Sequence, residues 1–517
     1  MNSPLLTQKL SEVIPPLEFY IGAFPLLVTL VGALTVLMVG VFRARPSQPH
    51  LPSFGVAIVT LVTAFGAAVA NLGNGSRSFI SGAFLADSLS QFAMATIALV
   101  GLFSFLISSI SSVGRNLLRF ELVTLQLFAI SGLMVMTSAG EFLSFFIGLE
   151  MTSLSLYVLV GYQREDAKGF EAAMKYFLLG SVASAILLMG QALVYLHTGS
   201  MAFSSYSSLS LSSASPLAFA GMLLLVVGLG FKMAMAPFHG WAPDVYQGAH
   251  ASLSGFMSGI VKLALVVVCI RVFGAGAKVP SAALVTGIWI MGALSIFLGS
   301  LFGLVHNNVK RMLAYSSIAN AGYFCLPLLA LMVNPNNSYA KPALLAYAVI
   351  YALLTLGAFG VISWLEEGNR EDLLKDELAG LGQKNPFAAV VLSIFLVGLA
   401  GVPPLAGFFG KFLILQAASS EGFVGLSILM VILSCVSLYF YLSLLVEMWF
   451  KGYHKYSIKT TEIPTLGLAK WVFGALALLV LFFGVAGPRF LKYVNFEESQ
   501  RNQLSSATRE SLVGESH

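Results

Sequence analysis

Four lysines stand inside stretches that are otherwise long apolar runs: Lys175, Lys232, Lys262 and Lys411. Lys262 is the clearest case, because about ten residues, or roughly 15 Å of helix, separate it from either end of its stretch. Its four-carbon side chain does not easily reach water from that depth. A charge there costs about 2.5–3.5 kcal/mol on insertion scales and normally faces a proton or ion path or a buried partner. These residues therefore predict proton or ion movement across a membrane.

A carboxylate lies in a similar position, since Glu150 stands in the middle of FFIGLEMTSLSLYVLVGY. A carboxylate beside a buried lysine keeps the lysine charged, and separating the two lets the lysine release its proton. Lys175 has a simpler alternative, because Glu171 lies four residues before it and suits an ordinary surface ion pair. His239 is either a proton relay or a capping and packing residue.

Composition predicts the class of protein. The 517 residues are 57% hydrophobic and only 10% charged, which is typical of a polytopic helical membrane protein. The cysteines Cys269, Cys325 and Cys435 are isolated from one another, so iron–sulfur, zinc and disulfide roles are not expected. The sequence contains neither a P-loop nor a dinucleotide-binding glycine motif after a strand. A gradient or another subunit must therefore drive the chemistry.

A helix-length window predicts an all-α fold of about fourteen transmembrane helices. These spans lie near residues 17–42, 52–72, 84–109, 120–140, 141–163, 170–197, 217–248, 252–274, 281–306, 311–333, 342–366, 386–420, 422–450 and 466–488.

The distribution of Lys and Arg predicts the orientation. The loops after odd-numbered spans hold fifteen of these residues, and the opposite side holds nine. Because cytoplasmic loops are enriched in Lys and Arg, we expect both termini on the outer side, lumenal or periplasmic. Apart from the four lysines above, every basic residue has an interfacial explanation.

Two spans are too long for one straight crossing. As continuous helices, Pro216–Gly248 and Pro386–Ser420 would be about 48 Å and about 52 Å long, against a hydrocarbon core of about 30 Å. Each carries proline near its middle, namely Pro237 in the first and Pro403 with Pro404 in the second. Proline breaks a helix, and broken helices are tolerated at membrane depth where they line a cavity.

The two breaks predict inverted repeats. Lys232 precedes its break and Lys411 follows its own, as a pair of repeats of opposite topology requires. We therefore expect N-terminal helices over 1–119, one antiporter-like repeat over 120–274, a second over 281–450, and a last helix with a polar tail over 451–517.

Four stretches carry a family resemblance: LEMTSLSLYVLVGY, FKMAMAPFHGWAPDVYQGAH, NNVKRMLAYSSIANAGY and GVPPLAGFFGKF. Together they resemble the antiporter-like membrane subunits of respiratory complex I. The resemblance is strongest to subunit 2, and in particular to the NAD(P)H–quinone oxidoreductase subunit 2 branch of the photosynthetic NDH complex in cyanobacteria and chloroplasts. It covers all fourteen spans. Subunit 4 of the same family and subunits of sodium/proton antiporters are the alternatives.

The resemblance implies roles for the charged residues. Glu150 and Lys232 look like the family's coupling ion pair. Lys262 looks like the central proton carrier, and Lys411 like the terminal one near the lumenal exit. An electrostatic change passing along them would turn distant redox chemistry into a proton step.

Two further positions are implied. Lys175 resembles a lysine that some subunit 2 members carry on span six, and His239 falls where the family has a histidine after the seventh-span break. The chain then resembles a non-redox, proton-translocating subunit of an NAD(P)H- or ferredoxin–plastoquinone oxidoreductase in the cyanobacterial thylakoid membrane. This implies no metal or cofactor on the chain itself. Nucleotide or ferredoxin, iron–sulfur clusters and plastoquinone would lie on partner membrane and hydrophilic subunits. The lipid bilayer is the other partner, and no nucleic acid is expected.

Overall fold

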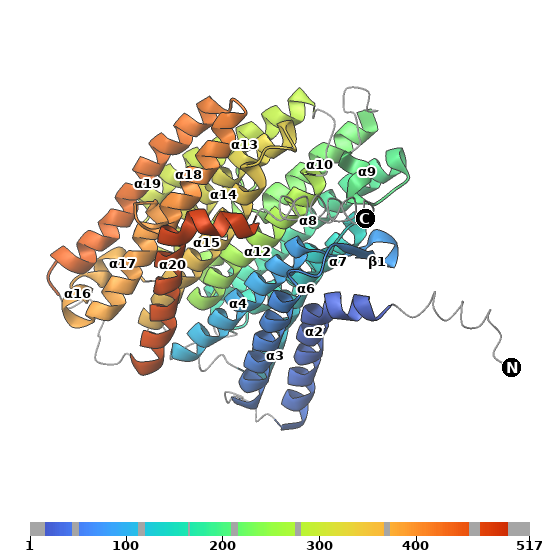
Figure 1. The fold of residues 1–517 in the computed structure, drawn as a ribbon. Coiled ribbons are helices and arrows are strands. Elements are labelled where there is room, and N and C mark those ends of the chain that lie inside the picture. The colour runs from blue at the N-terminus through green and yellow to red at the C-terminus, as the bar shows by residue number, and fades with distance from the viewer. Residues whose placement is uncertain are drawn as a thin grey trace, which may run out of the picture.

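The helices lie side by side in one bundle, with α2 and α19 at opposite edges (Figure 1). A computed structural model describes residues 16–43, 51–111, 119–163, 166–207, 216–274, 281–366, 373–453 and 466–494. Within these ranges, twelve helices are long and apolar enough to cross a membrane. They are α2 (Leu17–Arg43), α3 (Leu51–Ala70), α4 (Ser88–Ile110), α6 (Phe120–Ser138), α7 (Phe142–Val160), α8 (Ala167–Thr198), α12 (Ala251–Phe273), α13 (Ala282–Val305), α14 (Val309–Val333), α15 (Ala340–Leu365), α19 (Val424–Phe450) and α20 (Leu466–Val494).

The two over-long spans are broken, as predicted. The seventh consists of α10 (Pro216–Lys232) and α11 (Trp241–Gly248), and the twelfth of α17 (Pro386–Ala400) and α18 (Ala406–Ser420). At 1.5 Å per residue every half is shorter than a hydrocarbon core of about 30 Å. The twelve long helices and these two pairs correspond to the fourteen predicted spans.

The start of the third span differs from the prediction. The predicted boundary at residue 84 falls in a small hairpin, in which β1 (Arg77–Phe79) pairs antiparallel with β2 (Phe84–Ala86) around η1 (Ile80–Gly82). The helix begins only after Asp87, whose side chain accepts a hydrogen bond from the Ser90 backbone N–H in a capping box. Three other short elements lie in connections: α9 (Phe203–Ser207), η2 (Lys375–Leu378) and α16 (Leu381–Lys384).

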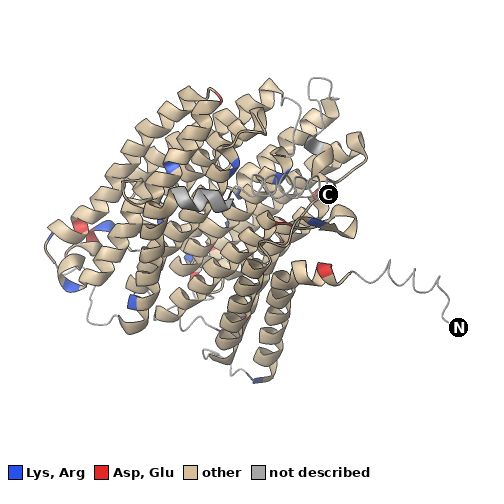
Figure 2. Cartoon of the chain, in the orientation of Figure 1, with Lys and Arg blue, Asp and Glu red and all other residues tan. Residues whose placement is uncertain are grey.

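Three helices form the centre of the bundle. In the most apolar windows of α12, α14 and α15, 94%, 89% and 100% of the residues are buried inside the protein. Positions coloured as charged residues are sparse on the drawn helices (Figure 2). A lysine on a central helix is therefore surrounded by protein and not by lipid.

The packing of the two predicted repeats corresponds helix by helix. α6 packs along α7 as α13 packs along α14, and α8 contacts both α10 and α11 as α15 contacts both α17 and α18. The domain boundaries and the in-plane pseudo-two-fold relation between the repeats stay predictions.

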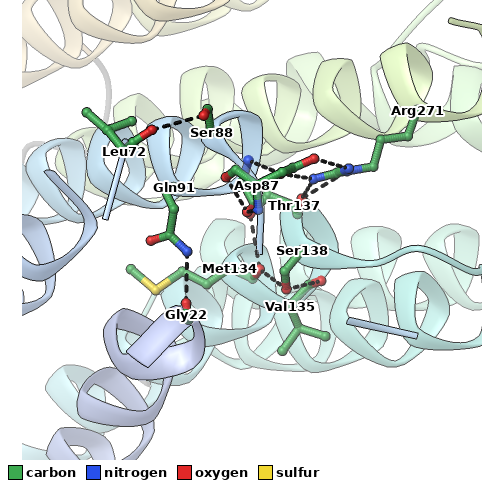
Figure 3. A network of polar contacts seen from close by, with 11 residues as sticks. Gly22, Leu72, Asp87, Ser88, Gln91, Met134, Val135, Thr137, Ser138 and Arg271 are labelled. Atoms are coloured by element: carbon green, nitrogen blue, oxygen red, sulfur yellow. Dashed lines mark hydrogen bonds and ion pairs between the residues drawn. The ribbon is translucent and has the colours of Figure 1, made fainter. Parts of the chain in front are cut away.

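Arg271 anchors the central helix α12 to the N-terminal helices (Figure 3). Its guanidinium makes two 2.8 Å hydrogen bonds to the Asp87 carboxylate and also donates to the Thr137 carbonyl at the end of α6. Only 7% of the Arg271 side chain is exposed. The three segments are thus held at a fixed distance by one bidentate ion pair, which we name the Arg271 clamp.

Two basic residues correct the expectation that all but four are interfacial. Arg271 is one. Lys310 is the other, because only 4% of its side chain is exposed and its Nζ lies 3.2 Å from the equally buried carboxylate of Glu366. Sequence position near a helix end indicated solvent in both cases, whereas neighbouring loops cover these ends and supply an acidic partner.

The Arg271 clamp yields a stability prediction. Arg271→Met removes one partner of a buried ion pair, which should lower the stability of the purified complex by about 3 kcal/mol and reduce its Tm. The matched control is Arg77→Met, whose pair with Glu18 is 47% and 55% exposed and should contribute at most about 1 kcal/mol. Equal Tm values for the two variants would contradict the clamp.

The same pair predicts a pH dependence. Burial raises the pKa of the Asp87 carboxyl, but the charge and hydrogen bonds of Arg271 outweigh burial and hold the pKa below its usual 3.8. A folded-state pKa below the unfolded value stabilises the fold above the unfolded pKa, and that stability is lost as the pH falls through the folded pKa. The Tm difference between wild type and Arg271→Met should therefore be full above about pH 4 and shrink below it.

Candidate functional site

Lys232 is the last residue of α10, directly before the first break. The backbone of the break is well satisfied: the Met235 N–H donates to the Gly230 carbonyl at 2.8 Å, and the Ala236 N–H donates to Ser295 Oγ on α13 at 2.8 Å. Trp241 Nε1 closes the turn by donating to the Phe231 carbonyl. The C-terminal end of a helix carries a partial negative charge, so α10 itself stabilises the Lys232 ammonium.

Glu150 and Lys232 lie in one cluster but make no direct ion pair within the described residues. Lys232 Nζ donates to Ser153 Oγ at 2.9 Å and approaches the Tyr157 hydroxyl at 3.4 Å. The Glu150 carboxylate instead accepts a 2.5 Å hydrogen bond from Ser184 Oγ on α8. In this structure Ser153 and Ser184 occupy the positions next to the two charges, and the coupling role of Glu150 and Lys232 stays a prediction.

Lys262 lies on the continuous helix α12 and is 2% exposed. Its Nζ donates to the carbonyl and the hydroxyl of Ser317 at 2.5 and 2.6 Å, and lies 3.4 Å from the Tyr351 hydroxyl. The ammonium also lies 4.8 Å from the centre of the Tyr351 ring. Neutral dipoles and an aromatic face thus hold this group.

Lys411 repeats the first lysine's arrangement from the opposite side of the second break. It lies on α18, and its Nζ donates at 2.8 Å to the carbonyl of Ala400, the last residue of α17. The ring of Tyr323 lies 5.2 Å from the same ammonium. Each first half-helix therefore has a lysine at its C-terminal end: Lys232 is the last residue of α10, and the Lys411 ammonium contacts the last carbonyl of α17.

A belt of hydroxyls and one amide lies between Lys262 and Lys411. Tyr347 OH donates to Asn320 Oδ1, whose own amide donates to the Ser316 carbonyl at 2.7 Å. Ser316 Oγ is hydrogen-bonded to the Tyr441 hydroxyl on α19. These four side chains are buried and connect α14, α15 and α19. These side chains place uncharged polar groups between the two lysines.

Lys175 is not isolated in an apolar run. Its Nζ lies 2.7 Å from both the Glu171 and the Asp244 carboxylates, and 41% of its side chain is exposed. Asp244 on α11 also pairs with Arg311 on α14 at 2.8 Å. The alternative of an ordinary ion pair with Glu171 is thus confirmed, within a network that connects the two predicted repeats.

His239 lies in the first break and is half-buried, and its Nδ1 is buried without a hydrogen-bond partner. Pro237 lies in the same break, and Pro403 with Pro404 in the second, as predicted. No three His, Cys, Asp or Glu side chains of the described chain come together as metal ligands.

Helical spacing could have identified some of the neutral partners. Ser153 and Tyr157 follow Glu150 by three and seven residues, so all three lie on one face of α7. Ser317, Tyr351 and Tyr323 come from α14 and α15, far from their lysines in sequence, and no local pattern connects them.

Known proteins share this architecture. Residues 139–437 match the family described as NADH:quinone oxidoreductase/Mrp antiporter, TM. The NADH-quinone oxidoreductase subunit N of Bdellovibrio bacteriovorus is 33% identical over 473 residues, which are 90% of this chain and 96% of that protein. The chain belongs to this family. Its place among the antiporter-like N subunits of the complex I family agrees with the resemblance carried by the four motifs.

Solved structures extend the comparison. A chain of respiratory complex I from Thermus thermophilus is 31% identical, with a TM-score of 0.77 over 90% of this chain and 98% of that one. A chain of the Mrp complex from Dietzia is 20% identical, with a TM-score of 0.79 over 92% and 96%. The second likeness shows the fold alone. The predicted all-helical, multi-pass, antiporter-like fold is confirmed.

The second break predicts the effect of a small substitution. Gly401 has φ +84°, and a Cβ there would lie 2.7 Å from Lys411 Cδ. Gly401→Ala should therefore cost about 1–2 kcal/mol in backbone strain and displace the Lys411 side chain, which lowers the Tm of the complex. Gly425→Ala on α19 is the control, because nothing lies within 4 Å of its Cβ position. An unchanged Tm in Gly401→Ala would contradict this geometry.

Proposed function

We propose that this chain carries protons across the membrane for a redox-driven NADH–quinone oxidoreductase, whose redox cofactors lie on partner subunits. One observation carries the proposal. Lys232, Lys262 and Lys411 are 6%, 2% and 8% exposed, and none of them pairs with a carboxylate among the described residues. Buried ionisable groups held only by neutral dipoles are suited to exchanging protons.

The arrangement supports a relay in which Glu150 controls the first lysine. A carboxylate near Lys232 favours its charged form, and Ser153 and Ser184 hold the two groups in one cluster without neutralising either. If the Glu150 charge is moved or screened, Lys232 releases its proton towards Lys262. The hydroxyl belt then supports transfer towards Lys411. His239, beside the first break, is proposed as an accessory proton site, and Lys175 as a member of the Asp244 network.

The proposed orientation places both termini on the outer side, as the excess of Lys and Arg on the opposite side indicates. Both terminal segments, residues 1–15 and 495–517, lie outside the described residues.

The photosynthetic assignment is a finer proposal. The four motifs support a subunit 2 of an NDH complex that takes electrons from ferredoxin or NAD(P)H, reduces plastoquinone and lies in a thylakoid membrane with lumenal termini. Quinone extraction and peptide mass spectrometry of the native complex test it. Plastoquinone with ferredoxin-binding subunits supports this branch, whereas another quinone with NADH-binding subunits overturns it.

A sodium/proton antiporter subunit is the second candidate, which the fold of the Mrp chain supports. Mass spectrometry of the detergent-solubilised complex separates the two. Co-purifying iron–sulfur and quinone-binding subunits support the redox-driven complex, and antiporter subunits alone support the second candidate.

Lys262 provides the direct test of proton carriage. Lys262→Ala should reduce the number of protons pumped per quinone by at least tenfold in reconstituted vesicles while the complex still assembles. Lys262→Arg should also impair pumping, because arginine does not release its proton. Lys451→Ala is the control, since Lys451 is 57% exposed and pairs with Glu447 on the same helix. Normal pumping by Lys262→Ala would remove Lys262 from the relay.

Variants of Glu150 test how proton pumping is coupled to quinone reduction, separately from which residues carry the protons. Glu150→Gln removes the charge and should uncouple pumping from quinone reduction, although every lysine remains. Glu150→Asp keeps the charge but shortens the side chain by one methylene, and should be milder. The ratio of protons to electrons is measured after assembly is verified by native gel. Equal ratios in the Gln and Asp variants would show that Glu150 is a packing residue.

A further inference from the structure

A polar cavity lies at one end of the bundle, apart from the breaks. Its cavity volume is about 30 Å³, on the order of one water molecule's share of liquid volume, and the space around it opens to the surroundings. Its walls come from the ends of α4, α7 and α11 and the beginnings of α6 and α12. The third, fifth and seventh spans end here, on the side that the count of Lys and Arg gives as the basic one. The polar residues that line it are Ser104, Ser108, Gln126, Tyr162, Gln163, His250 and Ser252.

A string of hydrogen bonds runs along this cavity to His250. The Ser108 hydroxyl donates to Ser252 Oγ at 3.0 Å, and Ser252 Oγ lies 2.8 Å from His250 Nδ1. One turn deeper along α4 than Ser108, Gln126 Nε2 donates to Ser104 Oγ at 2.8 Å. Side chains of α4, α6 and α12 thus form one polar wall.

The other nitrogen of the same imidazole is an exception in this wall. His250 Nε2 is buried and has no hydrogen-bond partner. A buried polar atom without a partner is costly, and such groups are retained where a transient partner such as water or a proton is part of the function. The unpartnered nitrogen is a second observation beside the cavity, and it also indicates that His250 takes part in proton transfer.

A stripe of side chains leads from His250 to the central lysine. His250, Ser254, Ser258 and Lys262 follow one another at intervals of four residues, so they lie along one face of α12 over about 18 Å. Ser254 and Ser258 are fully buried. The other residues of this part of α12 are mostly apolar, which makes the stripe the polar route through it.

We propose that this cavity and His250 form the proton-uptake path to Lys262, and that α4 and α6 build one wall of it. Both helices lie outside residues 139–437, the part that matches the family. The path therefore gives α4, one of the N-terminal helices, and α6 a direct part in uptake. This inference rests on the proposed function of the chain.

The step at His250 conserves charge. With the ring proton on Nε2, Nδ1 accepts a proton delivered through Ser252 while Nε2 releases its own towards the stripe, so one N–H bond forms as another breaks. A flip of the ring then turns Nδ1 towards the stripe, where it releases its proton while Nε2 takes one from the cavity side, so the ring regains its first tautomer. Burial and the charge of Lys310 lower the pKa of His250 to about 3, so the neutral ring passes protons on and does not store them. Lys310 keeps its own partner in Glu366, 3.2 Å away.

Pumping by the intact complex in vesicles tests the path, with imidazole as the probe. His250→Ala should pump at least tenfold more slowly, and 50 mM imidazole (on the order of enzyme rescue concentrations) should restore pumping because the vacated space adjoins the cavity. Ser108→Leu should also slow pumping by filling the cavity while His250 stays intact. The control is His306→Ala, because His306 stacks on Tyr315 away from the cavity and should pump normally with or without imidazole.

The Lys262→Ala variant distinguishes a failure of the proposed function from a failure of the uptake path. If Lys262→Ala pumps protons normally, Lys262 does not carry protons and the proposed function is wrong. If Lys262→Ala is inactive but His250→Ala and Ser108→Leu pump at the wild-type rate, the uptake path is wrong. A His250→Ala complex that imidazole does not restore shows a structural histidine and overturns the relay. If that variant does not assemble, the isosteric His250→Gln carries the same test, and normal pumping by it also overturns the relay.

Discussion

The structure depends on holding lysine ammonium groups in a low-dielectric interior without carboxylate partners. Two of the three buried lysines that lack a carboxylate partner lie at the C-terminal end of a half-helix: Lys232 is the last residue of α10, and the Lys411 ammonium donates to the last carbonyl of α17. The partial negative charge of that end compensates the ammonium. The helix breaks are therefore part of the site, because a continuous helix offers no such end at this depth.

The central helix α12 connects the remaining parts. Arg271 fixes one end to Asp87 and α6, His250 faces the polar cavity at the other end, and Lys262 lies between them. Both ends of α12 thus contact the N-terminal helices. These helices are more than a lipid-facing addition to the antiporter-like unit, because they determine where α12 lies and so where Lys262 meets Ser317 and Tyr351.

Much of this fold can be predicted from the sequence, and the reason is the membrane itself. Apolar runs of about twenty residues and prolines in over-long spans follow directly from hydrocarbon thickness and backbone hydrogen bonding. The neutral partners of the lysines could not be found in that way, because Ser317 is separated from Lys262 by 55 residues. The hydrogen-bond partner of Glu150 could not be found for the same reason, since Ser184 lies on another helix. The burial of Arg271 and Lys310 likewise depends on partners that only tertiary packing supplies.

Lysines at broken helices and the lysine on a continuous helix have different roles. The stabilisation of Lys232 and Lys411 depends on the position of a half-helix end, and a small movement of that half changes the affinity of the lysine for its proton. Lys262 is held by Ser317 of the buried helix α14, whose position does not depend on a break. A change in charge or packing at either break therefore alters first the proton affinity of the lysine at that break. The surroundings of Lys262, which lies between them, stay constant. Directional transfer needs this difference, because three identical sites would exchange protons equally in both directions.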